Sequence, residues 1–236
     1  LSREKFSKNS ASLPFNVKID LPTKSFREEV WLNLTSPLKH QLKSQAVVDF
    51  NDSSLIESVN ALRWDGFGWW SSNVDGSGVA RVAEYFGIDV ADGLTIGIIG
   101  GGGAARSTAH TWQKLGGKVM ILGGKRDMNE FNWFKGEVAE SRKCDVFINF
   151  DDDTLPDDVQ VSSLVIRSQY HGIDGEHEDR ISAITNEVID GRWLLAAQHL
   201  ECWSQLWAPQ ITDQLPTLDL LVSMLITAES VLASYS

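Results

Sequence analysis

The sequence predicts an α/β protein of two domains, one of them a Rossmann-type dinucleotide-binding domain. An apolar segment at residues 94–100, LTIGIIG, runs into a glycine-rich turn and a helical pattern, and a second apolar segment, KVMILGG at 118–124, follows. Two more apolar segments, CDVFINF at 144–150 and SLVIRSQY at 163–170, come later. Apolar strands with little alternation are typical of a parallel sheet that is covered on both faces.

The N-terminal part has its own mixture of strand and helix patterns. We expect strands at 15–22 and 31–34, a helix at 37–48, a hairpin at 58–76 and a helix at 79–87. Asp65-Gly66 is a common turn pair and marks the centre of the hairpin, and Gly87 is a typical helix stop.

Domain limits follow from these segments. Residues 1–91 form the expected N-terminal α/β domain and residues 92–191 the Rossmann-type domain. From about Asn186 the pattern is helical, interrupted by a linker at 208–214. We expect residues 192–236 to pack back on the first domain and complete it.

Composition excludes several classes of protein. The net charge of −11 argues against a nucleic-acid or an anionic membrane surface as the main partner. Cys144 and Cys202 lie far apart, with no spacing that indicates a disulfide framework or a metal site. No segment reads as a membrane span or signal peptide, so we expect a cytoplasmic protein. The chain begins with Leu1, which indicates processing or a longer parent polypeptide.

The glycine-rich turn predicts the cofactor. Gly100, Gly102 and Ala105 fit the pattern G-x-G-x-x-A between a strand and a helix, where a helix N-terminus faces a pyrophosphate. Lys125 and Arg126 follow the next strand, where NAD-specific sites usually carry a carboxylate. Two cations suit the 2′-phosphate of NADP. The alternatives are a glycine-rich turn without a ligand and a solvated basic loop.

Lys39 stands in the first turn of the predicted helix at 37–48, which Thr35 and Ser36 can cap. A cation there opposes the helix dipole at a cost of about 0.3–1 kcal/mol if it is exposed. An exposed lysine and a functional lysine both fit. Taken singly, Asp75 fits a helix cap and Asn60 a turn residue.

Several motifs together resemble shikimate dehydrogenase. They are NLTSPLK at 33–39, SVNAL at 58–62, SNVDG at 72–76, IGIIGGGGAAR at 96–106, CDVFINF, Tyr170 and LLAAQ at 194–198. The similarity spans roughly residues 30–207, and their order and spacing are more specific than any one motif. The resemblance implies reversible, NADP-dependent oxidation of shikimate to 3-dehydroshikimate in aromatic amino-acid biosynthesis.

The resemblance also implies residue roles. Lys39 and Asp75 would bind the reacting hydroxyl and exchange its proton. The substrate-binding residues would be Thr35, Asn60, Gln198 and Tyr170, with Ser10 and Ser12 as a remnant of the family's carboxylate-binding S-x-S-P motif. The cofactor-binding residues would be Gly100, Gly102, Gly103, Ala104, Ala105, Arg106, Lys125, Arg126 and Asn149.

Some positions depart from the family pattern. Val74 replaces a threonine, Asn149-Phe150-Asp151 replaces Asn-Ala-Thr, and Trp193 stands where the family has a glycine and would narrow the cofactor cleft. The segment ahead of Lys39 is also shorter than in the family. A quinate-type dehydrogenase and a non-catalytic binding or regulatory protein remain as alternatives. The expected assembly is a monomer or homodimer, alone or as part of a multifunctional pathway protein.

Overall fold

The computed structural model describes residues 29–36, 38–40, 47–128, 131–134, 142–152, 154–170, 176–186 and 189–233. The strand predicted at 15–22, and Ser10 and Ser12, lie outside these residues. The chain divides into two compact units, Leu1–Asn73 and Val74–Ser236. Each unit is described by itself.

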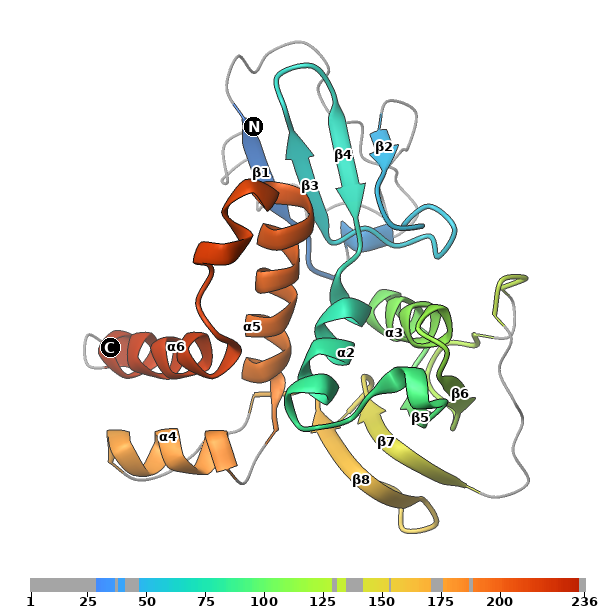
Figure 1. Cartoon of the computed structure of the whole chain (residues 1–236). Coiled ribbons are helices and arrows are strands. Elements are labelled where there is room, and N and C mark those ends of the chain that lie inside the picture. The colour runs from blue at the N-terminus through green and yellow to red at the C-terminus, as the bar shows by residue number, and fades with distance from the viewer. Residues whose placement is uncertain are drawn as a thin grey trace. The chain divides into compact units, whose positions relative to one another are not determined.

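The described residues of the first unit form a four-stranded sheet in the order β1-β3-β4-β2 (Figure 1). β3 pairs antiparallel with β1 and β4, which confirms the predicted strand at 31–34 and the hairpin, whereas β2 runs parallel to β4. A small apolar core includes the buried Leu62, Trp64 and Trp69. The strands are β1 (Val30–Asn33), β2 (Val47–Asp49), β3 (Ala61–Trp64) and β4 (Trp69–Ser72).

The helix predicted at 37–48 is wrong at its C-terminal end, at residues 47 and 48, while residues 37 and 41–46 lie outside the described residues. A single 3₁₀ turn, η1 (Leu38–His40), carries Lys39. Val47 and Val48 belong to β2 and pair with Trp69 and Trp70 of β4. β-branched side chains fit a pleated sheet better than a helix, so tertiary pairing overrides the local helical pattern.

Asp65 closes the hairpin between β3 and β4. Its Oδ1 accepts hydrogen bonds from the N–H groups of Phe67 at 2.9 Å and Gly68 at 2.8 Å, and its Oδ2 accepts from Trp70 Nε1 at 2.8 Å. These hydrogen bonds lower the pKa of Asp65 below its ordinary value. The bond from the Gly68 N–H has the largest effect, and those from the Phe67 N–H and the Trp70 indole come next.

We expect Asp65→Ala to lower the free energy of unfolding of the first unit by about 1 kcal/mol, because these hydrogen bonds are lost. The pKa of Asp65 is lowered by folding, so its contribution is complete above the ordinary value and is lost as pH falls through the folded value. Urea unfolding at pH 7 and in acid checks this. Equal destabilisation at both pH values would contradict it.

The second unit contains a four-stranded parallel sheet in the order β6-β5-β7-β8. Helix α3 connects β5 to β6, which confirms the predicted β-α-β unit (Figure 1). Ile96, Ile98, Val146 and Ile148 are buried in the core. The elements are β5 (Thr95–Ile99), α3 (Gly103–Lys114), β6 (Lys118–Ile121), β7 (Lys143–Asn149) and β8 (Gln160–Arg167).

Helices complete the second unit. α2 packs against both α3 and α5, and α6 packs against α4 and α5. The sequence did not predict α4, and the linker predicted at 208–214 is largely the 3₁₀ helix η4. Over the described residues, no helix is long and apolar enough to cross a membrane. The helices are α2 (Asp75–Tyr85), η2 (Val90–Asp92), α4 (His177–Asn186), α5 (Gly191–Glu201), the π-helix η3 (Cys202–Trp207), η4 (Pro209–Gln214) and α6 (Leu218–Ala233).

The division between the units falls earlier in the chain than the predicted boundary at residues 91 and 92. The reason is α2, which packs on α3 and α5 and therefore belongs to the second unit. That α5 and α6 also complete the N-terminal domain stays a prediction.

Candidate active site

The strand order of the parallel sheet contains a switch point. β5 lies between β6 and β7. The chain passes from β5 to β6 on one side and later enters β7 on the opposite side of β5. In open α/β sheets, ligands bind outside the carboxyl ends of the strands at such a switch point. The glycine-rich turn follows β5 at this edge.

The turn meets the three requirements of a dinucleotide fingerprint. Gly100 has φ +120°, a conformation that favours glycine and makes the tight turn. Gly102 caps α3, and a Cβ there would meet only the Arg126 guanidinium, 3.8 Å away, so its outer side is open to a ligand. Ala105 is fully buried and packs the helix closely on the sheet. The residues present therefore fit a bound pyrophosphate.

The predicted cations differ in their surroundings. Arg126 is exposed, with its guanidinium beside Gly102 at the N-terminus of α3. Lys125 is also exposed, but its ammonium donates to the Asp151 carbonyl at 3.2 Å. Arg106 is buried, and its guanidinium carbon lies 4.8 Å from the centre of the Phe131 ring. Of the three, Arg126 is best placed for a phosphate.

Asn149 holds the loop that follows β7. Its buried amide donates to Asp152 Oδ1 and the Thr154 carbonyl, and its Oδ1 accepts from the N–H groups of Asp151 and Asp152. The Thr154 N–H and hydroxyl, together with this amide, lower the pKa of Asp152. The amide of Asn149 is thus committed to the loop, and its predicted contact with a cofactor stays a prediction.

A cavity of about 160 Å³ collects predicted residues from three separate motifs. Asp75 at the start of α2, Tyr170 after β8 and Gln198 on α5 all line it. Ala104, from the glycine-rich turn, lines it as well, so the cavity adjoins the expected cofactor site. The remaining lining residues are Val79, Phe150, Ser168, Gly191, Leu194 and Leu195.

Two glycines let α2 pack closely between α3 and α5 (Figure 1). The Gly76 N–H donates to Ser107 Oγ at 2.9 Å, and a Cβ on Gly76 would lie 2.2 Å from the Ser107 carbonyl oxygen. A Cβ on Gly78 would lie 3.0 Å from the backbone nitrogen of Gln198. These contacts fix Asp75 and Gln198, which come from different helices, on one cavity.

We expect Gly76→Ala to lower the free energy of unfolding of the second unit by about 1–3 kcal/mol, because the new methyl group overlaps backbone of α3. Chemical denaturation measures this change. Gly78→Ala is the matched control on the same helix: its tightest contact, 3.0 Å, needs only a small shift of α5, so the expected loss is smaller. Equal effects of the two substitutions would contradict this view of the packing.

Trp193 does not line the cavity, and as a fully buried core residue it does not project into a cofactor cleft, contrary to the expectation from sequence. The side chain is fully buried on another face of α5, and its Nε1 donates to the Ile184 carbonyl at 2.7 Å. Its ring lies 5.1 Å from that of Tyr85 and 5.0 Å from that of Phe86. The glycine that does line the cavity is Gly191, where a Cβ would meet the Ser168 carbonyl oxygen at 2.9 Å.

The Tyr170 ring lies beside a buried ion pair. The Arg192 guanidinium carbon lies 5.8 Å from its ring centre, and this guanidinium pairs with Asp190 and Glu229. Partial burial of the phenol, helped by the carboxylates of Asp190 and Glu229, raises the pKa of Tyr170 above its ordinary value. The phenol therefore stays protonated at neutral pH and is available as a hydrogen-bond donor.

Three predicted residues of the first unit, Thr35, Lys39 and Asn60, lie on neighbouring segments. The Val59 N–H donates to the Lys39 carbonyl at 2.9 Å, and the Leu34 N–H donates to the Asn60 carbonyl at 2.6 Å. These bonds hold the segments that carry Thr35, Lys39 and Asn60 side by side. Asn60 is buried, Lys39 is half-buried and Thr35 is exposed. The pairing of Lys39 with Asp75 joins the two units and stays a prediction.

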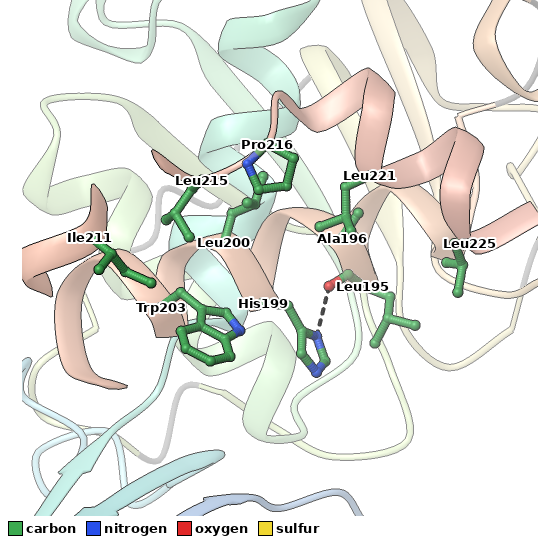
Figure 2. A pocket seen from close by; sticks show the side chains of 10 residues that line it. All are labelled: Leu195, Ala196, His199, Leu200, Trp203, Ile211, Leu215, Pro216, Leu221 and Leu225. Carbon is green, nitrogen blue, oxygen red and sulfur yellow. Dashed lines mark hydrogen bonds between the residues drawn. The ribbon is translucent and has the colours of Figure 1, made fainter. Parts of the chain in front are cut away.

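A second cavity, of about 450 Å³, has a different character (Figure 2). His199 is the one titratable residue in its lining, and its Nδ1 is 2.9 Å from the Leu195 carbonyl, to which it must donate. This apolar cavity has one imidazole and no second titratable side chain beside it in its lining, so it lacks the paired groups needed to bind and deprotonate a polyhydroxy ring. The other lining residues are Ala196, Leu200, Trp203, Ile211, Leu215, Pro216, Leu221 and Leu225.

Sequence comparison places part of the chain beside known enzymes. No family model matches it. A shikimate dehydrogenase (NADP⁺) of Methylibium petroleiphilum is 29% identical over 94 residues, which are 39% of this chain and 32% of the relative. One of Methanococcoides burtonii is 38% identical over 93 residues, which are 38% of this chain and 32% of the relative. The chain thus spans about a third of the length of the curated relatives it matches.

Structure comparison gives the fold. Shikimate 5-dehydrogenase of Thermus thermophilus, in complex with NADP(H) and shikimate, superposes with a TM-score of 0.63 at 18% identity. The match covers 87% of this chain and 80% of that chain. The resemblance inferred from the motifs is confirmed: the chain is related in sequence to shikimate dehydrogenases and shares their fold. The predicted fold class, α/β with a Rossmann-type domain, is confirmed with it.

Proposed function

We propose that the chain is an NADP-dependent oxidoreductase that interconverts shikimate and 3-dehydroshikimate. One observation carries the proposal: Asp75, Tyr170 and Gln198 line one cavity beside the glycine-rich turn, at the carboxyl ends of a parallel sheet. The sequence relatives named shikimate dehydrogenase (NADP⁺), and a neighbouring structure that contains NADP(H) and shikimate, support the same ring acid and cofactor.

The cofactor site would be built from the turn after β5. The N–H groups at the start of α3 would bind the pyrophosphate, with Gly102 open to its approach. The exposed Arg126 beside Gly102 would neutralise phosphate charge. When bound, NADP supplies the acceptor for the hydride that leaves the ring carbon.

The remaining residues would hold the ring and move its proton. The Asp75 carboxylate would accept a hydrogen bond from the reacting hydroxyl, and Lys39 would exchange the proton of that hydroxyl. The Gln198 amide would bind neighbouring hydroxyls, and the protonated phenol of Tyr170 would donate to the substrate. A cytoplasmic location, a monomer or homodimer, and a place in a multifunctional pathway protein stay predictions.

A quinate-type dehydrogenase would use the same site with another ring acid. The non-catalytic alternative gains support from one feature, a carboxylate that lies against the glycine-rich turn. Asp151 Oδ1 would be 3.4 Å from a Cβ at Gly100, close to where a pyrophosphate would approach.

Turnover with defined ring acids tests the proposal. Purified protein is mixed with shikimate or quinate and with NADP⁺ or NAD⁺, and NADPH or NADH absorbance is followed. The expected result is the highest kcat/KM with shikimate and NADP⁺. Binding of NADP⁺ without turnover of any ring acid would favour the non-catalytic alternative, and faster turnover of quinate would shift the substrate.

A further inference from the structure

Two loops at the carboxyl edge of the parallel sheet are joined across the glycine-rich turn. The Lys125 N–H, in the loop after β6, donates to Asp151 Oδ2 at 2.5 Å, and the Lys125 ammonium donates to the Asp151 carbonyl at 3.2 Å. Asp151 lies in the loop after β7, on the other side of β5. We call this pair of contacts the Lys125–Asp151 clasp.

The clasp lies directly on the first glycine of the turn. The Gly100 N–H donates to the Gly123 carbonyl at 2.9 Å. A Cβ on Gly124 would lie 2.6 Å from the Gly100 backbone and 3.1 Å from Asp151 Oδ2. A Cβ on Gly100 would lie 3.4 Å from Asp151 Oδ1. The carboxylate is therefore packed against the turn.

A dinucleotide bound at this switch point would cross the glycine-rich turn nearly where the Lys125–Asp151 clasp crosses it. Its pyrophosphate lies at the turn after the central strand, and its two halves extend toward the strands on either side. Here those strands are β6 and β7, the two that the clasp connects. The Asp151 carboxylate would thus stand beside two phosphates of like charge, where each disfavours the other.

We propose that Asp151 gates the dinucleotide site, its carboxylate holding Lys125 across Gly100 until the clasp opens to admit the pyrophosphate at Gly102. The inference rests on the proposed function for the identity of the ligand. It gives a physical role to one departure from the family pattern, since Asp151 stands where that pattern has a threonine. The clasp lowers cofactor affinity and keeps the closed turn ordered.

Binding of NADP⁺ by isothermal titration calorimetry tests the gate. Asp151→Ala removes the charge and the carboxylate contact of the clasp and leaves only the backbone carbonyl as an acceptor for the Lys125 ammonium. Asp151→Asn removes the charge but keeps a side-chain acceptor for the Lys125 N–H. Asp157→Asn is the matched control, because Asp157 is exposed in the same acidic loop. We expect Asp151→Ala to tighten binding about tenfold, Asp151→Asn to tighten it less, and Asp157→Asn to leave it within about twofold.

Amide hydrogen exchange at Lys125 gives a second readout that needs no turnover. The clasp predicts slow exchange in the wild type, faster exchange in Asp151→Ala, and faster exchange in the wild type when NADP⁺ is added. Wild-type binding that Asp151→Ala does not tighten, or that Asp157→Asn tightens equally, overturns the gate and leaves the proposed function standing. Absence of dinucleotide binding in the wild type and every variant overturns both.

Discussion

Lys39→Ala is expected to lower kcat for shikimate oxidation by a factor of about 10²–10⁴, the usual contribution of a general acid or base. In the proposed mechanism the alcohol proton then has no acceptor, whereas the cofactor site, which belongs to the second unit, is untouched. The affinity for NADP⁺ should therefore remain at the wild-type value. Steady-state NADPH formation and calorimetric binding measure the two quantities.

Lys39→Arg separates charge from proton transfer. Arginine keeps the positive charge but does not release its proton in the physiological range. We expect this variant to keep a KM close to that of the wild type and to lose kcat almost as far as Lys39→Ala. Lys118→Ala, at an exposed position at the start of β6, controls for the loss of one positive charge. A wild-type rate in Lys39→Ala would contradict the role of Lys39.

Arg192→Met should give the largest loss of stability, about 3–5 kcal/mol in the free energy of unfolding. The Arg192 guanidinium is nearly inaccessible to solvent and pairs with Asp190, whose side chain is 0% exposed. It also binds both carboxylate oxygens of Glu229 on α6, at 3.2 and 2.9 Å. Methionine would leave the buried Asp190 carboxylate without its guanidinium partner, and an uncompensated buried charge strongly destabilises the folded state.

Arg180→Met is the matched control for this prediction. Arg180 lies 3.9 Å from the same Glu229 carboxylate but is partly exposed, so we expect a loss of about 1 kcal/mol or less. Adding Asp190→Asn to Arg192→Met should recover part of the loss, because the stranded charge is removed. Urea unfolding measures all three variants. Equal losses for Arg180→Met and Arg192→Met would show that burial of the pair is unimportant.

The sequence was sufficient for the β5-α3-β6 unit. The apolar run of β5, the glycines at Gly100 and Gly102 and the amphipathic helix are local signals, and local patterns determine these elements. The motif order also brought together Asp75, Tyr170 and Gln198, which the structure places on one cavity.

Elements that depend on distant partners could not be predicted in this way. β2 is a strand because Val47 and Val48 pair with β4, whereas the local sequence pattern favours a helix. Trp193 faces the core because Tyr85, Phe86 and the Ile184 carbonyl surround it.

The small lining residues of the cavity were missed for a related reason. Ser168 and Gly191 belong to no chemical motif, and only their positions in the fold give them a role. Ser168 directly follows the end of β8, which is the one signal that could have found it.

Kinetics of two cavity variants test the central claim, that the cavity beside the glycine-rich turn is the reaction site. With shikimate varied at saturating NADP⁺, Asp75→Asn should lower kcat about a hundredfold or more with little change in KM, because the carboxylate acts on the reacting hydroxyl. Gln198→Ala should mainly raise KM, because it binds hydroxyls that do not react. Wild-type kcat and KM in both variants would contradict the account.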